Sequence, residues 1–400
     1  MQLGIRLILS AMLTLAAGVA SADTVKIGVL SDMNGPYADV VGEGSVVATK
    51  LAVEDIGGKV LGMPIEVISA NTQNKPDIAS AIARQWLDDE NVDVIIGGSS
   101  SAAGLAIQEV AREKQHLFLI TDSASSDFTG KACSPFGMQF TYDTYALANG
   151  TARAMVKRGG DTWFFITADY AFGHALERDT SKFVLDAGGK VLGEVRHPLN
   201  NSDFSSYLLQ AQASKAKVIG LANASTDAVN AIKQGTEFGI VEGGQRMAAL
   251  LMFIADVEAL GLKSAQGLVL TESFYWDIND KTRAWSKRFM AKMNGKVPTM
   301  GHAGAYAAAL HYLEAVKEAG TKDPKTVAAK MREMPVNDMY NDNVRIRPDG
   351  RVLHKMYLLQ VKAPAESKYP HDDYHILAQT PGEEAFRPMD QGGCPLVAKQ

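Results

Sequence analysis

Short apolar runs of strand length alternate with segments of helical spacing along the first part of the chain. Apolar residues recur every three or four positions at 46–56 and 78–87, which is the period of an amphipathic helix. Strands that alternate with helices in this way build a mostly parallel sheet covered on both faces. Four strands are predicted in this series: Val25–Ser31, 65–70, 92–96 and Leu117–Ile120.

The same alternation starts again after a helical segment at 146–158. It is long enough to form a second α/β domain of ordinary size. Residues 271–278 then lead away from this series, and a hairpin is expected around Pro348-Asp349-Gly350. The second series contains the predicted strands 162–166, 190–196, 218–222 and 247–254.

We therefore expect two α/β lobes whose segments are interleaved along the chain. Residues 23–141 and 271–350 are predicted to form lobe 1, and residues 142–270 and 351–362 to form lobe 2. The remaining residues, 363–400, are predicted to be a C-terminal extension.

The first 22 residues have the pattern of an export signal. Arg6 precedes an apolar run at 7–19, and Ala20-Ser21-Ala22 supplies the small residues at which a signal peptidase cuts. No cysteine follows the run, so a lipid anchor is not expected. We expect a soluble protein that starts at Asp23 and resides in the periplasm of a cell with two membranes.

The chain has two cysteines, Cys133 and Cys394. In an oxidising compartment such a pair is expected to form a disulfide, the alternative being two free, buried thiols. A bond between them would return the extension 363–400 toward lobe 1.

Composition and motifs exclude several classes of function. Lys and Arg number 40 against 45 Asp and Glu, with no basic stripe, so nucleic acid is not an expected partner. Residues 97–101 (GGSSS) lack the closing glycine of a nucleophile elbow. His371 and His375 stand four residues apart, but in a tail flanked by prolines, which is weak support for a metal site. We expect that the protein is not an enzyme and that it binds no cofactor or metal.

Hydroxyl side chains gather at the ends of two consecutive predicted strands. Residues 99–101 are three serines, and residues 121–126 (TDSASS) follow the next strand. In an open parallel sheet, ligands bind at the carboxyl ends of the strands, where helix N–H groups and hydroxyls can meet an anion. For a single serine the alternative is a helix N-cap. Two such clusters favour a receptor for a carboxylate or phosphate.

Motifs in a characteristic order cover almost the whole mature chain. They are VKIGVLSDMNGPYADVVG, VDVIIGGSSSAAG and LFLITDSASSDFTG in lobe 1, followed by FFITADYAFGHAL, DFSSYLLQAQASKAKVIGLAN and AGAYAAALHYLEAV. The chain resembles the type I periplasmic solute-binding proteins of ABC importers, in the branched-chain amino acid group. The resemblance implies two doubly wound α/β lobes joined by three crossing strands, which close on a ligand by hinge bending. It also implies a monomer whose partners are permease subunits with a cytoplasmic ATPase.

The resemblance assigns binding residues in lobe 1. The serine that contacts a ligand carboxylate corresponds to Ser101, with Ser100 beside it. A main-chain contact corresponds to Ser123, and a nearby hydroxyl to Ser125. The aromatic residue after the first turn corresponds to Tyr37.

Lobe 2 departs from the pattern of the amino-acid binders that the chain resembles. Those proteins hold the ligand ammonium with an acid after a strand, whereas the matching stretch 250–254 (LLMFI) has none. An unpaired buried ammonium would cost several kcal/mol. Asp143 and Asp256 are the candidates to compensate, and the usual lobe 2 tyrosine is replaced around Asn223.

Aromatic residues near predicted strand ends are more numerous than a binding site for a valine side chain would need. Related sequences with stretches like TYDTYALANGT and VRHPLNNSDFSS are associated with benzoates and hydroxycinnamates, so the expected ligand is a small aromatic carboxylate. The alternatives are a branched-chain or other amino acid or amide, or a periplasmic sensor for a membrane kinase. The aromatic candidates, some of which could instead pack in the lobe cores, are Tyr37, Tyr145, Tyr170, Phe172, Phe253, Phe274, Tyr275 and Trp276, and His302 is a further hydrogen-bonding candidate.

Overall fold

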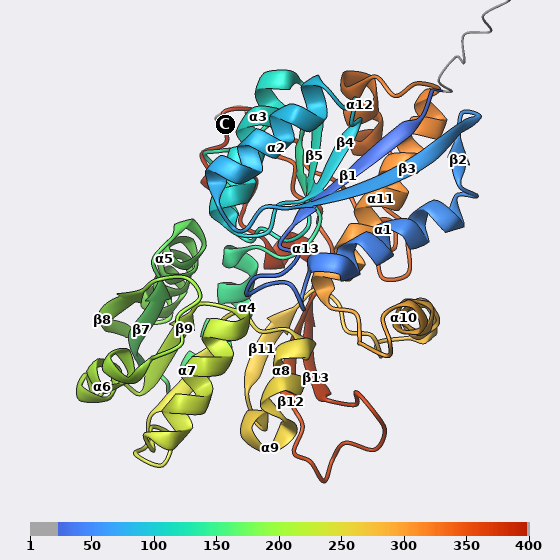
Figure 1. Cartoon of the computed structure of the whole chain (residues 1–400). Coiled ribbons are helices and arrows are strands. Elements are labelled where there is room, and N and C mark those ends of the chain that lie inside the picture. Colours follow the sequence, from blue (N-terminus) through green and yellow to red (C-terminus); the bar gives the residue numbers. More distant parts are fainter. Residues whose placement is uncertain (1–22, 398–400) are drawn as a thin grey trace, which may run out of the picture.

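The structure, a computed structural model, describes residues 23–397 (Figure 1). The predicted signal peptide, residues 1–22, lies outside the described residues. Three sheets organise the described chain. We call the six-stranded sheet and its helices lobe 1, and the four-stranded sheet and its helices lobe 2.

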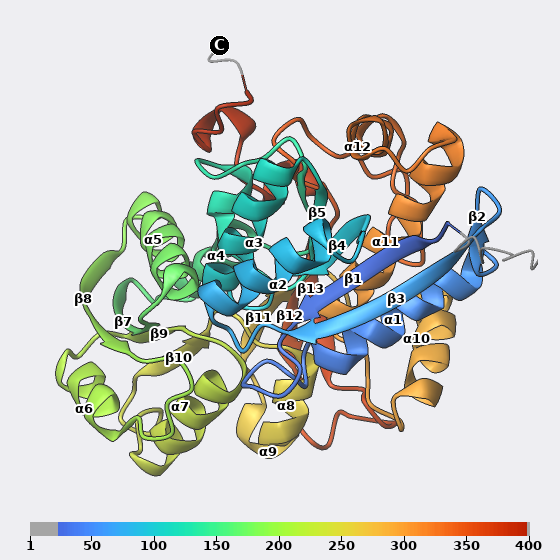
Figure 2. The ribbon, with the colours of Figure 1, turned by 45° about the horizontal axis from the view of Figure 1, so that its top comes forward.

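Lobe 1 contains a sheet with the strand order β2-β3-β1-β4-β5-β6. Its pairs are parallel except for the short pair β2 and β3. Helices α2 and α3 pack on one face, and α1 and α11 on the other (Figure 2). The strands are β1 (Val25–Ser31), β2 (Lys59–Val60), β3 (Met63–Asn71), β4 (Val94–Gly97), β5 (Leu117–Ile120) and β6 (Gly137–Gln139). The helices are α1 (Gly42–Asp55), α2 (Pro76–Asp88), α3 (Ser101–Lys114), α10 (Asp280–Lys292), α11 (Met300–Ala319) and α12 (Pro324–Glu333), with a short 3-10 turn η1 (Ser126–Thr129).

Alternate residues of one central strand show why this sheet is covered on both faces. Val94 and Ile96 pack in the core that includes α1 and α11, whereas Ile95 packs with Trp86 of α2 in a second core. All four residues of β4 are buried. Because a parallel strand is apolar on both sides, it appears in the sequence as a continuous apolar run.

Lobe 2 repeats this plan with a four-stranded parallel sheet of order β10-β9-β7-β8. The predicted fold class, two doubly wound α/β lobes, is therefore confirmed. The strands are β7 (Thr162–Ala168), β8 (Lys190–His197), β9 (Val218–Ala222) and β10 (Arg246–Ala249). The helices are α4 (Thr144–Lys157), α5 (Ala171–Asp186), α6 (Ser205–Ala213), α7 (Ser225–Glu237), α8 (Ile254–Leu260) and α9 (Leu262–Ala265).

A third, antiparallel sheet of order β11-β12-β13 lies beside lobe 2 (Figure 1). Its strands come from segments far apart in the chain: β11 (Val269–Glu272), β12 (Met356–Val361) and β13 (Tyr374–Thr380), and the short elements α13 (Gly382–Ala385) and η2 (Met389–Gln391) follow. The hairpin predicted around Pro348-Asp349-Gly350 is present at its turn, where an antiparallel bridge joins Ile346 to Val352 and the N–H of Arg347 donates to the carbonyl oxygen of Arg351 at 2.9 Å. It does not extend along 352–361 as predicted, because β12 pairs with β11 and β13. The lobe boundaries at 141, 270 and 350 stay a prediction.

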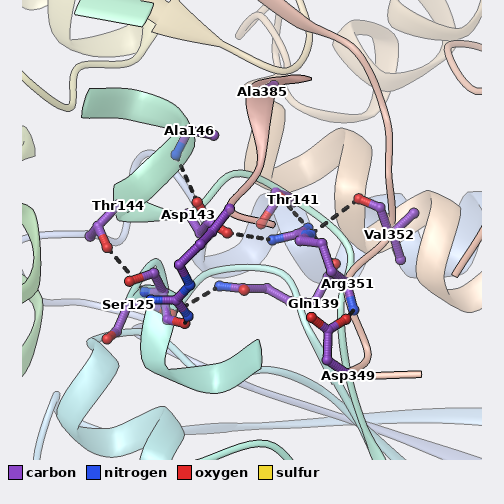
Figure 3. Close-up of polar contacts among 12 residues, drawn as sticks. Ser125, Gln139, Thr141, Asp143, Thr144, Ala146, Asp349, Arg351, Val352 and Ala385 are labelled. Carbon is purple, nitrogen blue, oxygen red and sulfur yellow. Dashed lines mark hydrogen bonds and ion pairs between the residues drawn. The ribbon is translucent and has the colours of Figure 1, made fainter. Parts of the chain in front are cut away.

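Arg351 is buried where the segments that connect the lobes meet (Figure 3). Its guanidinium donates hydrogen bonds to the carbonyl oxygens of Gln139 and Thr141, and its Nε to that of Val352 at 3.1 Å. Its Nη1 lies 3.4 Å from a carboxylate oxygen of Asp143. One side chain therefore ties the segment that follows β6 to the segment that precedes β12.

Cys133 and Cys394 form a disulfide, with their Cα atoms 5.6 Å apart. This confirms the predicted pairing. The bond joins the loop before β6 in lobe 1 to the tail after η2. Within residues 23–397, no helix combines the length and apolar character that a membrane crossing requires.

Candidate ligand-binding site

A cavity lies between the lobes, beyond the carboxyl ends of β4 and β5. The space between its lining atoms, including the open solvent at its mouth, is about 330 Å³. Lobe 1 contributes hydroxyl and carboxyl groups together with Tyr37, Val41 and Ala124, and lobe 2 contributes mainly aromatic and aliphatic side chains. The lining residues are Tyr37, Val41, Ser99, Ser100, Ser101, Asp122, Ala124, Tyr142, Tyr170, Phe172, Ala224, Leu251 and Phe253.

A tight turn brings the first serine cluster into the cavity. Gly97 and Gly98 have φ values of 122° and 120°, and a Cβ atom on Gly97 would lie 2.5 Å from the carbonyl oxygen of Leu30. Both glycines are therefore required by the close passage of the backbone. Ser100 then caps α3, because its Oγ accepts a hydrogen bond from the N–H of Ala103. The turn places Ser101 at the first helical position.

Ser101 is built to donate a hydrogen bond into the cavity. Its Oγ accepts the N–H of Ala124 at 3.2 Å and that of Ser125 at 3.0 Å. A hydroxyl has two acceptor lone pairs and one donor hydrogen, so these two bonds leave the hydrogen for a ligand. The N–H groups of Ser101 and Ala102 also lack intrahelical acceptors, because they begin α3. An anion at the start of α3 would be favoured by free N–H groups and by the positive end of the helix dipole.

The other predicted serines of this region hold the loops in place. Ser100 lines the cavity, but its hydroxyl donates to the carbonyl oxygen of Asn74 at 3.3 Å. Ser123 donates to the carbonyl oxygen of Ser99 at 3.0 Å, and Ser125 accepts the N–H of Asp127 at 3.2 Å. The structure therefore does not bring the Ser123 and Ser125 side chains into the cavity lining.

Aromatic rings close the opposite side of the cavity. Tyr170 and Phe172 lie at the start of α5, with ring centroids 5.8 Å apart. Tyr142, which the sequence analysis did not select, meets Phe253 edge to face at 5.7 Å. Leu251 completes this wall. The lining residues from lobe 2 carry no charge, so this half of the cavity suits an uncharged ring or aliphatic group.

Four other predicted ligand contacts lie outside the lining, each held by other partners. The Tyr145 ring packs edge to face on Phe183, the Asn223 side chain meets the His197 ring at 3.1 Å, and the Tyr275 hydroxyl donates to the carbonyl oxygen of His371. His302 bonds the carbonyl oxygen of Val41 at 2.9 Å through Nε2 and accepts the N–H of Thr299 through Nδ1. Burial lowers the pKa of His302 to about 4, as expected for a neutral histidine that packs inside lobe 1.

The two candidates to compensate for the missing lobe 2 acid are both engaged elsewhere. Asp143 pairs with Arg351, and Asp256 accepts the N–H of Phe253 at 3.0 Å at the start of α8. The acid in the lining is Asp122, which the sequence analysis did not select. Its charge, the only one among residues 121–126 after β5, is the signal that could have identified it.

The lobes contact each other directly across the cavity. The hydroxyl groups of Tyr37 and Tyr170 are hydrogen-bonded, and burial raises the pKa of both phenols above the ordinary value. A second contact joins Arg178 of α5 to Asp127 of η1 at 3.3 Å. The structure is therefore a closed arrangement of the lobes.

Replacing Tyr37 with phenylalanine is expected to weaken closure. The variant loses the hydrogen bond to Tyr170, which at a net value of roughly 0.5–1.5 kcal/mol shifts the ratio of closed to open forms by about 2- to 10-fold. Small-angle scattering without ligand should show a larger radius of gyration. Tyr207→Phe, on α6 away from the cavity, is the control. Equal radii for the two variants would contradict the role of this contact.

Comparisons with known proteins agree with this architecture. A family model described as periplasmic binding protein matches residues 24–368. A crystal structure of a periplasmic binding protein from Burkholderia mallei is 50% identical, with a TM-score of 0.92, over 94% of this chain and 100% of that one. A branched-chain amino acid ABC transporter periplasmic ligand-binding protein from Burkholderia xenovorans is 39% identical, with a TM-score of 0.82, over 93% of this chain and 100% of that one.

More distant relatives differ in what they are said to bind. A Leu/Ile/Val-binding protein homolog from Brucella suis is 26% identical over 65% of this chain and 67% of its own length. A solute-binding protein from R. palustris, solved in complex with benzoate, shares the fold with a TM-score of 0.81 over 93% of this chain and 100% of that one, at 20% identity. The chain therefore belongs to the periplasmic binding proteins of type I, in the non-enzymatic family of branched-chain amino acid ABC transporter substrate-binding proteins.

Proposed function

We propose that this protein captures a small aromatic carboxylate, of the benzoate or hydroxycinnamate type, and delivers it to an ABC permease with its ATPase. The observation that carries the proposal is the donor hydrogen of Ser101. Two N–H groups occupy its lone pairs, so its hydrogen is left for an acceptor on the ligand. Hydrogen bonds to an ionised acceptor such as a carboxylate are shorter and roughly twice as strong as those to a neutral acceptor.

The remainder of the cavity supports a ring as the body of the ligand. Tyr142, Tyr170, Phe172 and Phe253 surround the uncharged side. Each ring contact is worth roughly 0.5–1.5 kcal/mol beyond the burial of area. The benzoate complex of the R. palustris relative indicates that this fold can accommodate such a ligand.

Capture is proposed to work by lobe closure in the periplasm. The site is divided between the lobes, so a ligand contacts both halves at once only in the closed form. A ligand that binds the closed form better shifts the population toward it. The permease would then distinguish a loaded protein by its closed lobes.

A branched-chain amino acid is the second candidate. The Burkholderia xenovorans relative, at 39% identity, is described as a branched-chain amino acid protein, and Asp122 places one carboxylate in the cavity. Calorimetric titration with benzoate, 4-hydroxybenzoate, p-coumarate and leucine separates the two candidates. Binding of an aromatic acid is the expected result, and tight leucine binding without any response to the aromatic acids would overturn the proposal.

Replacing Ser101 with alanine is expected to weaken carboxylate binding by about 10- to 100-fold. The variant removes a hydrogen bond to a charged group, which contributes roughly 1.5–3 kcal/mol. Calorimetry with the tightest aromatic ligand measures the change, and a thermal melt records any loss of fold. Ser80→Ala, in which a serine of α2 bonded to Asp77 is truncated, is the matched control. If both variants bind as tightly as the parent protein, Ser101 does not hold the carboxylate.

A further inference from the structure

Asp122 is the one acidic side chain among the lining residues, and it is almost fully buried, with 8% of its surface exposed. It lies two residues after the end of β5. The Ser31 hydroxyl donates to its Oδ2 at 2.5 Å, and the Thr121 hydroxyl donates to its Oδ1 at 2.9 Å. These bonds fix the plane of the carboxyl group at the edge of the cavity.

The carboxyl group of Asp122 can still accept further hydrogen bonds. The two oxygens of a carboxylate offer about four acceptor positions. Ser31 and Thr121 occupy two of them, and the nearby N–H of Ser99 also favours the ionised form. The lining residues include no Lys, Arg or His that could pair with the charge. A buried carboxylate with no cationic partner is costly, and a donor on the ligand would relieve that cost.

We propose that Asp122 determines ligand specificity by accepting a hydrogen bond from a donor group that the ligand carries in addition to its carboxylate. This inference rests on the proposed function and deepens it, because it divides the polar end of the cavity into two parts. Ser101 and the start of α3 take an acceptor, and Asp122 takes a donor. The donor can be a phenolic hydroxyl on a ring or an ammonium group on an amino acid, and both present N–H or O–H to the same oxygen atoms.

The pH dependence of binding distinguishes a ligand contact of Asp122 from a purely structural role, which would not change with pH in the same way. Burial raises the pKa of Asp122 to about 6, and the titratable groups that face it are Asp32 and Tyr142. A hydrogen-bond donor on the ligand stabilises the ionised form of Asp122. Preference for a donor-bearing ligand should therefore increase as the pH rises through about 6 and be weaker below it.

Two matched ligand pairs test the inference by calorimetry on the whole mature protein. The pairs are 4-hydroxybenzoate with benzoate, and leucine with 4-methylpentanoate, and in each the first member adds a donor. We expect one pair to show a preference of at least about 10-fold for its donor-bearing member. In Asp122→Asn this preference should fall to about threefold or less. Asp338→Asn, in which a half-buried acid of lobe 1 outside the lining is neutralised, should keep it.

The outcomes separate this inference from the proposed function. Equal binding within both pairs, or a preference that Asp122→Asn leaves unchanged, overturns the role of Asp122. If neither aromatic acid binds, the proposed ligand class is overturned. The role of Asp122 still stands in that case if leucine binds more tightly than 4-methylpentanoate. If Asp122→Asn does not fold, the pH profile of the preference in the parent protein decides, and a flat profile between pH 5 and about 7 contradicts the inference.

Discussion

Replacing Arg351 with methionine is expected to lower the free energy of unfolding by roughly 3–5 kcal/mol. Arg351 is fully buried, and its guanidinium donates to the carbonyl oxygens of Gln139, Thr141 and Val352. Methionine fills a similar volume but leaves these oxygens without their donor. It also leaves Asp143 as a buried carboxyl without a cation.

The electrostatics of this pair explain why its loss is costly. Burial raises the pKa of Asp143 and lowers that of Arg351 to about 10, so removal from water outweighs the attraction between them. A buried ion pair of this kind adds little net stability, but removing one member leaves the other as a buried charge whose loss of hydration is not compensated. Asp143 also caps α4 by accepting the N–H of Ala146 at 2.8 Å, so the damage extends to the first helix of lobe 2.

Urea unfolding followed by circular dichroism measures the effect of Arg351→Met. Arg345→Met is the control, because Arg345 is exposed and pairs with Glu383 on the surface. An exposed pair contributes about 1 kcal/mol or less. Equal unfolding midpoints for the two variants would show that the connecting segments do not depend on the Arg351 network.

Removing the disulfide by Cys133→Ser with Cys394→Ser is expected to lower the free energy of unfolding by roughly 2–4 kcal/mol. The bond closes a loop of 261 residues and so restricts the unfolded chain strongly. The tail should nevertheless stay on lobe 1, because Arg387 donates to the carbonyl oxygen of Ser126 at 2.6 Å and Arg347 donates to the carbonyl oxygen of Arg387 at 2.9 Å.

Thermal unfolding of the double variant beside the parent protein, each with and without a reductant, checks this prediction. The reductant should lower the melting temperature of the parent protein toward that of the variant and leave the variant unchanged. A double variant that melts with the oxidised parent would show that the bond adds no stability.

The sequence predicts the central strands of the two main sheets well because these strands are apolar on both faces. Val94, Ile95 and Ile96 form a continuous run that identifies β4 directly. The third sheet was not predicted in full, because its pairing depends on contacts between distant segments. β13 in particular has mostly exposed side chains and lies in a polar tail that shows no apolar pattern.

Only part of the site was predicted, because the rest also depends on contacts between segments that are distant in the chain. The serine cluster after β4 lines the cavity as expected, because the carboxyl ends of parallel strands meet at one edge of the sheet. The direction of a side chain in the loops beyond a strand is set by tertiary contacts. Ser125 therefore turns to Asp127, whereas Asp122 and Tyr142 reach the cavity, and the spacing of residues does not distinguish them.

A crystal structure of the protein grown with 4-hydroxybenzoate tests the central claim most directly. We expect the ligand in the cavity, with its carboxylate within hydrogen-bonding distance of the Ser101 Oγ and of the first N–H groups of α3. Its ring should lie against Tyr170 and Phe253. A ligand bound elsewhere, or one whose carboxylate has no contact with Ser101, would contradict the account.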